Sequence, residues 1–156
     1  MNKTNAMRLL DAAKINYSAV EYEVDENDLS GIHIANQLGQ DKECVFKTLV
    51  TRSNNGVYTV FCIPVAEELD LKKCAAASGH KSVEMIAVKE LLPVTGYIRG
   101  GCSPIGMKKP FATYIDETAM LFDKIFVSGG KRGTQICISP ENLIDFIGGK
   151  YADLVK

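Results

Sequence analysis

The sequence predicts an α/β chain of the α+β type, in which a mixed, mainly antiparallel curved sheet or barrel is surrounded by helices. Two observations favour this architecture. Segments rich in β-branched residues flank the tight-turn sequences at 54–56 and 129–133, which indicates hairpins. Short helical patterns lie between these segments, but hairpins outnumber strand–helix–strand units, which argues against a doubly wound sheet. At 156 residues the chain is expected to form a single domain spanning 1–156.

The first half of the chain predicts two helices and three strands. Thr4 and Ser30 are suitable helix caps, and Gly39 is a suitable helix end. Alternating apolar residues indicate the strands. The expected elements are a helix at 4–15, a strand at 18–24, a helix at 30–39 and the paired strands 44–52 and 57–63.

The second half predicts three further helices and a second hairpin. Asp70 and Ser139 are the helix caps, and Pro93 is expected to limit or kink a helix that begins at Val88. The expected elements are a helix at 70–79, a strand at 82–87, a helix at 88–92, a strand at 111–115, a helical turn at 118–121, the paired strands 124–127 and 134–138, and a helix at 139–148.

Composition excludes several classes of protein. With 46% hydrophobic and 24% charged residues, the chain is neither disordered nor fibrous. No apolar run approaches the roughly eighteen residues that a membrane helix needs, and the N-terminus lacks the apolar core of a signal peptide. Cytoplasm is therefore the expected location. The net charge of −1 argues against a non-specific nucleic-acid binder.

No metal or cofactor is expected, because the five cysteines are widely spaced and no paired histidines complete a zinc site. Cys102 lies in a glycine-rich loop where its pKa could be depressed, although no base is apparent for it. The chain has only His33 and His80 for a catalytic triad, and a structural role is favoured for both. An enzyme here would work without a recognisable side-chain nucleophile.

The stretch 95–110 combines four glycines with three basic residues and no acid. The backbone N–H groups of Gly100 and Gly101 could bind an anion or an oxyanion, with Arg99 nearby to attract a phosphate. A wide surface loop is the alternative. The second glycine loop, 128–133, carries Lys131 and has similar chemistry, so the two loops together would form a positive patch suited to a few phosphates.

Lys47 lies in a strand that is otherwise strongly apolar. Alternation places it on the face of Val45 and Leu49, which should be the inner face if those side chains belong to the core. A lysine at such a position either reaches to the rim of the sheet or faces a polar cavity. Both possibilities remain open from the residues alone.

Three ordered motifs carry a resemblance to a known family. They are Val-Phe-Lys-Thr-Leu at 45–49, Gly-Tyr-Ile-Arg-Gly-Gly-Cys-Ser-Pro-Ile-Gly at 96–106 and Val-Ser-Gly-Gly-Lys-Arg-Gly at 127–133. Over essentially its whole length the chain resembles the YbaK family, freestanding relatives of the editing domain inserted in bacterial prolyl-tRNA synthetases. The resemblance implies a mixed β-barrel ringed by helices and an aminoacyl-tRNA deacylase acting on mischarged tRNA, typically Cys-tRNA(Pro).

The resemblance also implies roles for individual residues. Lys47 would contact the terminal adenosine and phosphate of the tRNA. Gly100 and Gly101 would supply backbone contacts at the aminoacyl ester. The pocket would be lined by further substrate-binding residues, among which we also count the basic residues of the two loops: Tyr22, Leu29, Thr48, Ser128, Arg99 and Lys131.

The expected chemistry needs no enzyme nucleophile, because an aminoacyl ester is already activated and can react once it is oriented and its oxyanion stabilised. In this family the thiol of a cysteinyl substrate is thought to attack its own carbonyl. Leu29 stands where well-known members have an aromatic residue, so another small amino acid such as alanine remains an alternative substrate. Prolyl-tRNA synthetase is an expected partner. A non-catalytic module that binds a tRNA end or a nucleotide, and a Cys102-dependent enzyme, are the competing hypotheses.

Overall fold

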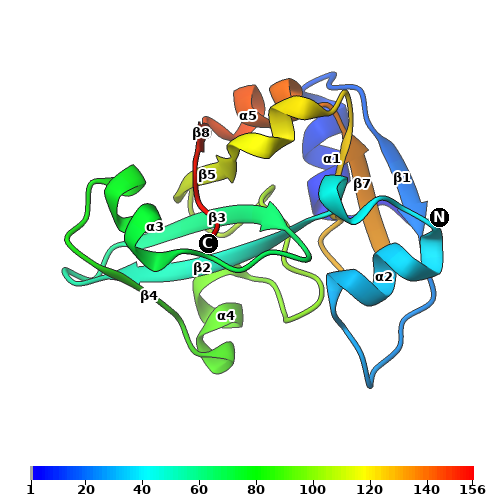
Figure 1. The fold of residues 1–156 in the computed structure, drawn as a ribbon. Coiled ribbons are helices and arrows are strands. Elements are labelled where there is room, and N and C mark those ends of the chain that lie inside the picture. Colours follow the sequence, from blue (N-terminus) through cyan, green and yellow to red (C-terminus); the bar gives the residue numbers. More distant parts are fainter. Residues whose placement is uncertain (1) are drawn as a thin grey trace.

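Two β-sheets form the centre of the structure, a computed structural model that describes residues 2–156 (Figure 1). The larger sheet has the strand order β4-β2-β3-β5-β8, and the smaller has the order β1-β7-β6. Pairing is antiparallel except between β3 and β5 and between β5 and β8. The strands are β1 (Ser18–Glu21), β2 (Phe46–Ser53), β3 (Tyr58–Pro64), β4 (Val83–Met85), β5 (Ala112–Asp116), β6 (Ile125–Ser128), β7 (Thr134–Ile138) and β8 (Lys150–Ala152).

The helices begin and end where capping chemistry predicts. The side chains of Thr4, Ser30, Asp70 and Ser139 each accept a backbone N–H of the first turn. Glycines in the left-handed conformation end four of the helices. The helices are α1 (Asn5–Ala12), α2 (Gly31–Leu38), α3 (Leu71–Ser78), α4 (Val88–Thr95) and α5 (Pro140–Ile147), with 3₁₀ turns η1 (Lys42–Cys44) and η2 (Glu117–Leu121).

The larger sheet is buried on both faces, because alternate residues of β3 point into different cores. Val60 and Cys62 join the main core, which lies between the two sheets and includes residues of α1 and α5. Phe61 and Ile63 join a second core under α3. Figure 1 shows α3 over the left part of β2 and β3, and α1 beside the smaller sheet on the right. Both faces of a strand that crosses this layer are therefore apolar, which explains the near-continuous apolar run of β3.

A single parallel bridge between Val45 and Phe126 joins β2 to β6 and thus the two sheets. Among the described residues β2 has no further bridge to β6, and β2 pairs with β4 only from Thr51 onward. The expected mixed, mainly antiparallel architecture is confirmed. It consists of two sheets that part along one seam.

Several element boundaries differ from the expectations. The first strand ends at Glu21, because after Tyr22 donates to the carbonyl of Gly133 the chain leaves the sheet. The long strand begins at Phe46 because Asp41 caps a 3₁₀ turn just before it. The first helix stops at Ala12, three residues early, and the strand expected at 82–87 is confined to Val83–Met85.

The helix that contains Pro93 continues past it to Thr95 instead of ending there. Its last turn is held by two bonds that do not need the missing proline N–H. Thr95 Oγ1 donates to the Leu91 carbonyl at 2.8 Å, and the Gly96 amide donates to the Leu92 carbonyl at 2.9 Å. The sequence also did not predict β8, a three-residue strand with little periodicity to detect.

Candidate functional site

The seam between the sheets leaves one edge of β2 without a neighbouring strand. The Val45 carbonyl accepts from the Val65 amide, so Val45 faces the β3 side, whereas the Val50 carbonyl accepts from the Ile86 amide of the β4 side. Because backbone groups alternate along a strand, those of Phe46 and Thr48 point away from β3. The bridge between Val45 and Phe126 covers this side of β2 at Phe46, but between that bridge and Thr51, where β4 begins to pair, no strand of the described residues pairs with this side at Thr48. This free edge is one wall of a cavity.

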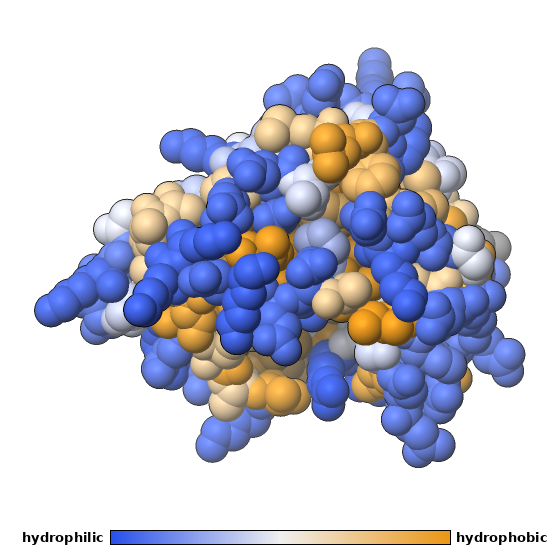
Figure 2. All heavy atoms as spheres, in the orientation of Figure 1, coloured by the Kyte–Doolittle hydropathy of each residue, from blue (hydrophilic) through white to orange (hydrophobic). Residues whose placement is uncertain are grey.

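The cavity has a volume of about 360 Å³ and is lined mainly by apolar side chains. In the space-filling view, apolar side chains surround a hollow on this face of the molecule, between the positions of α2 and α4 (Figure 2). Segments from β2, α2, β4 with α4, the first glycine loop and β6 contribute to its walls. All the predicted site residues except Gly101 and Lys131 line it: Tyr22, Leu29, Lys47, Thr48, Arg99, Gly100 and Ser128.

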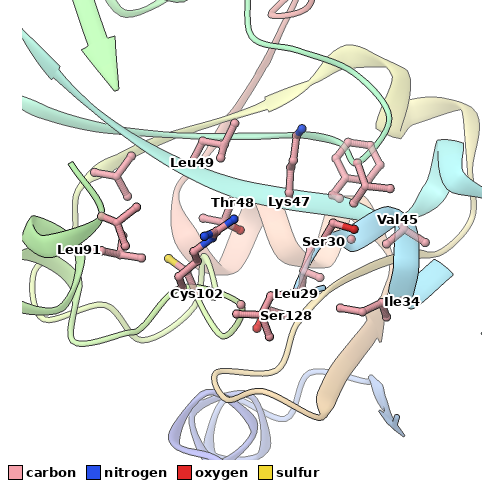
Figure 3. A pocket seen from close by; sticks show the side chains of 18 of the residues that line it. Leu29, Ser30, Ile34, Val45, Lys47, Thr48, Leu49, Leu91, Cys102 and Ser128 are labelled. Atoms are coloured by element: carbon pink, nitrogen blue, oxygen red, sulfur yellow. The ribbon is translucent and has the colours of Figure 1, made fainter. Parts of the chain in front are cut away.

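Lys47 and Thr48 leave opposite faces of β2, as neighbouring residues of a strand must. Figure 3 shows Lys47 and Leu49 on one side of the strand, and Thr48, Cys102, Ser128 and Leu29 gathered on the other. Since both Lys47 and Thr48 line the cavity, the cavity extends around the free edge of the strand. The expectation that Lys47 shares a face with Leu49 holds, but both faces of the sheet are core faces.

The Lys47 ammonium is half-buried and has no ion-pair partner among the described residues. Burial lowers the pKa of Lys47 below its ordinary value, and the negative charges of Glu68 and Glu67 oppose this shift. A half-buried cation without a partner is unfavourable. It is therefore available for an anion that enters the cavity.

The thiol of Cys102 is not activated. Burial raises its pKa to about 12, so the thiolate is scarcely populated at neutral pH. Cys62, whose sulfur lies 3.7 Å from Thr48 Oγ1, has a pKa raised to about 12 for the same reason. Neither cysteine has the electropositive setting of a catalytic nucleophile.

Side-chain and backbone bonds fold the first glycine loop onto itself. The Thr95 hydroxyl accepts from the Tyr97 amide at 3.0 Å, and the Thr95 carbonyl accepts from the backbone amide of Lys108 at 3.0 Å. The Tyr97 hydroxyl donates to the Ile105 carbonyl, and the buried Ser103 hydroxyl accepts from the Ile105 amide at 3.2 Å. These hydrogen bonds make the loop compact, so it is not a wide surface loop.

Gly100 and Gly101 differ in what their backbone can offer. Gly100 has φ +85°, lines the cavity, and its amide has no backbone partner among the described residues. The Gly101 amide donates to the Ile98 carbonyl at 3.0 Å, and Gly101 does not line the cavity. A single amide of the pair, that of Gly100, is thus free to contact a ligand, whereas we had expected two.

The second glycine loop lies directly behind the first. A Cβ on Gly101 would lie 3.0 Å from Lys131 Cα and 3.1 Å from the Arg132 amide nitrogen, so only glycine allows this approach. Ser128 lines the cavity, and its hydroxyl accepts from the Gly130 amide at 3.3 Å. The backbone of Lys131 packs against Gly101, whereas the exposed Lys131 side chain is not part of the cavity wall. The two loops therefore come together, which is the condition on which the sequence analysis based a shared patch.

Sequence reasoning missed two parts of the wall. Met85, Val88 and Leu91 from β4 and α4 form an apolar side, and no motif marks them. Gln135 forms the other part and is paired with Gln40 through reciprocal amide bonds of 2.9 and 3.2 Å. The sequence feature that could have indicated this part of the wall is a glutamine within the otherwise apolar strand 134–138.

Residues 2–156 contain no group of three or more histidine, cysteine or acidic side chains placed to hold a metal ion. No helix in the same range is long and apolar enough to cross a membrane.

Sequence comparisons point to one family, and a solved structure shares the fold. Residues 32–146 match the family model of the aminoacyl-tRNA editing domain. A candidate Cys-tRNA(Pro)/Cys-tRNA(Cys) deacylase of Enterococcus faecalis, EbsC, is 49% identical over 97% of this chain and 93% of its own length. Proline–tRNA ligase of Thermosipho melanesiensis is 26% identical over 86% of this chain, which corresponds to 26% of the ligase. The crystal structure of a candidate trans-editing enzyme for prolyl-tRNA synthetase superposes with a TM-score of 0.83 at 22% identity, covering 99% of both chains.

Proposed function

The chain belongs to the aminoacyl-tRNA editing domain family, and from this premise we propose that it hydrolyses the ester of mischarged aminoacyl-tRNA, with Cys-tRNA(Pro) as the preferred substrate. The resemblance found in the sequence motifs is confirmed at the level of the family. One observation carries the proposal: a single cavity joins an unpaired ammonium, Lys47, to a free glycine amide, Gly100.

The size and lining of the cavity suit the aminoacylated end of a tRNA. Its volume of about 360 Å³ lies in the range of small-molecule sites. That space suits one nucleoside with a small aminoacyl group, and a nucleic-acid duplex would have to remain outside. The apolar side formed by Met85, Val88 and Leu91 suits a base or a small side chain, and the polar groups on the facing walls suit the ester.

In the proposed complex Lys47 binds the phosphate of the terminal nucleotide. The side chain is half-buried and lacks an internal anion, so a phosphate would supply the missing counter-charge. Because the phosphate and the ester belong to the same nucleotide, holding one positions the other. Lys47 would thus act by orientation and charge, at a distance from the reacting carbonyl.

In the proposed reaction the Gly100 amide stabilises the oxyanion. Water attacks the ester carbonyl carbon, and the carbonyl oxygen gains negative charge that the Gly100 N–H stabilises. The bond to the ribose oxygen then breaks, and that oxygen leaves as a hydroxyl with a proton from the attacking water. The products are a free amino acid and an uncharged tRNA. With a cysteinyl ester, the substrate thiol can replace water: a C–S bond forms as the same C–O bond breaks, the thiol proton passes to the departing ribose oxygen, and the products are a cyclic thioester of cysteine and an uncharged tRNA.

No cysteine of the enzyme is needed as a nucleophile. The high pKa of Cys102 disfavours the alternative in which this residue performs acyl transfer. Cys102→Ala should therefore retain deacylation.

We also propose that prolyl-tRNA synthetase supplies tRNA identity in the cytoplasm, where aminoacyl-tRNAs are used. A protein with net charge −1 can make few phosphate contacts, so its own selectivity among tRNAs should be weak. The proline–tRNA ligase relative contains a matching segment within a longer chain. Adding the synthetase should lower the KM for Cys-tRNA(Pro) more than that for another cysteinyl-tRNA.

The test is a deacylation panel with the purified protein and Cys-tRNA(Pro), Ala-tRNA(Pro) and Pro-tRNA(Pro). The proposal expects rapid loss of the cysteinyl ester and a stable prolyl ester. A fast alanyl reaction would instead assign the pocket beside Leu29 to alanine. Lys47→Ala should reduce the rate about 10²-fold or more, because a substrate whose phosphate is no longer held loses the orientation of its ester. Lys72→Ala, which removes an exposed lysine of α3, is the matched control.

A specific result would refute the deacylase. If the protein retards tRNA in a gel while all three esters decay at their spontaneous rates, the chain is a binding module. Equal activity of Lys47→Ala and wild type would discard the proposed role of that residue, provided that urea unfolding shows both proteins folded.

A further inference from the structure

Arg132 connects three segments that are distant in the sequence. Its Nε donates to the Arg99 carbonyl of the first glycine loop at 2.9 Å. Its Nη1 donates to Glu26 Oε2, in the acidic turn after β1, at 3.0 Å. Arg132 itself belongs to the second glycine loop and does not line the main cavity. Its charge already has a partner, so it is a poor candidate for a direct phosphate contact.

The bond to Arg99 fixes a peptide whose other end faces the site. The Arg99 carbonyl and the Gly100 N–H belong to one peptide unit, and no cis peptide bond occurs in the described chain. In a trans peptide the C=O and N–H point in opposite directions. Gly100 lies between the main cavity and a small hollow that contains Arg132. With the carbonyl directed at Arg132, the amide is directed away from it, toward the main cavity.

This peptide needs an external support. Gly100, at φ +85°, has no side chain that would resist rotation of the preceding peptide plane. No other hydrogen bond to the Arg99 carbonyl or from the Gly100 amide occurs among residues 2–156. The guanidinium also rests on the glycine, since a Cβ there would lie 3.3 Å from Arg132 Nε and 3.5 Å from its Cγ. Arg132 is thus the group that holds the peptide in orientation.

We propose that Arg132 is a positioning residue for deacylation: it holds the Arg99–Gly100 peptide so that the Gly100 N–H donates to the oxyanion. This inference rests on the proposed function. A charged donor on the carbonyl also polarises the peptide and strengthens its N–H as a donor. Glu26 orients the guanidinium from the solvent side, where a more exposed ion pair contributes less.

The kinetic test compares Arg132→Ala, Arg132→Lys and Glu26→Gln with wild type on Cys-tRNA(Pro). Arg132→Ala should lower kcat by about 10²-fold with KM changed less than about twofold, because the lost interaction acts in the transition state. Arg132→Lys keeps the charge but lacks the planar fork, so we expect about a tenfold loss of kcat. Glu26→Gln should lose less than about threefold. Millimolar guanidinium should partly restore Arg132→Ala.

Arg52→Ala is the matched control. Arg52 has a similar exposure and pairs with Glu90 at 2.7 Å, but it holds no peptide of the glycine loops. Its removal should leave kcat unchanged, and guanidinium should not affect that variant. A kcat for Arg132→Ala within about threefold of wild type would overturn the proposal. So would a raised KM at unchanged kcat, which would identify a phosphate contact.

An independent readout separates this inference from the proposed function. In ¹⁵N–¹H spectra the Gly100 amide resonance should shift and its hydrogen exchange should change in Arg132→Ala, and in Arg52→Ala it should not. An unchanged Gly100 resonance in a folded Arg132→Ala protein would refute the positioning role whether or not the wild type deacylates any tRNA. If wild type is inactive but the resonance moves, the deacylase is refuted and the support of the peptide by Arg132 stands.

Discussion

The two polar walls of the cavity are built in different ways. The β2 wall is held by a backbone ladder to β3 that runs from Phe46 to Arg52, so its geometry does not depend on any one side chain. The wall formed by the glycine loops is held by a few side chains, chiefly those of Thr95, Tyr97 and Arg132, which bind backbone groups.

The difference determines what each wall can offer. A strand presents side chains alternately on its two faces, so Lys47 and Thr48 reach the cavity from opposite sides of one edge. A glycine loop presents bare backbone, which allows Gly100 to offer an amide without an obstructing side chain. Substitutions should therefore act on β2 through the ladder and on the loops through individual contacts.

The largest expected effect comes from proline in β2. Lys47→Pro removes an N–H that faces Ile63 in the ladder. The free energy of unfolding should fall by about 1–3 kcal/mol for the carbonyl left without its donor, and further because the ring does not fit a paired strand. Thr48→Pro removes an N–H on the free edge and should cost less than about 1 kcal/mol. Urea unfolding measures both, and Thr48→Val serves as the control for the lost hydroxyl. Equal losses for the two prolines would show that the edge is not free.

A smaller effect is expected from Gly101→Ala in the loop wall. The added methyl would meet backbone atoms of Lys131 and Arg132 at 3.0 to 3.1 Å, and backbone cannot move aside as a side chain can. Overpacking of this kind costs about 1–3 kcal/mol, and it should also lower deacylation by separating the loops. Gly56→Ala, where φ is +82° but the space around the glycine is open, is the control for activity: backbone strain at that turn should lower stability and leave deacylation unchanged. A Gly101→Ala protein as stable and active as wild type would contradict the close approach.

The sequence predicted the β2 wall better than the loop wall, for a physical reason. Local signals suffice for a hairpin, since Asn54-Asn55-Gly56 specifies the turn and alternation then assigns Lys47 to a face. Which edge of β2 remains free depends on β4 and β6, which follow much later in the chain, and no local pattern contains that information.

In the loop wall, too, local sequence patterns do not determine the detailed geometry. Glycine content predicted that the backbone would face a ligand, but not that Gly101 would use its amide internally while Gly100 keeps its own free. The direction of one peptide plane depends on Arg132, a contact between residues 33 positions apart. The apolar side around Val88 carried no chemical motif, because any apolar residues of suitable size can form it.

The smallest effect, and the one with the opposite sign, is expected from Lys47→Met. At neutral pH the half-buried ammonium is incompletely hydrated, so its removal should raise the free energy of unfolding by less than about 1 kcal/mol, since partial exposure and the attraction of Glu67 and Glu68 reduce the penalty. Deacylation should be lost.

The stability effect of Lys47 should depend on pH. The pKa of Lys47 is lower in the folded chain than its ordinary value of 10.5, so between these two pKa values the unfolded chain binds more protons than the folded chain. The stability of the wild type therefore rises with pH through that window. The advantage of Lys47→Met should therefore shrink toward alkaline pH. Lys72→Met, which removes an exposed lysine of α3, is the control. A Lys47→Met protein less stable than wild type at neutral pH would mean that the ammonium already has a stabilising partner within the protein and is not available to bind a phosphate.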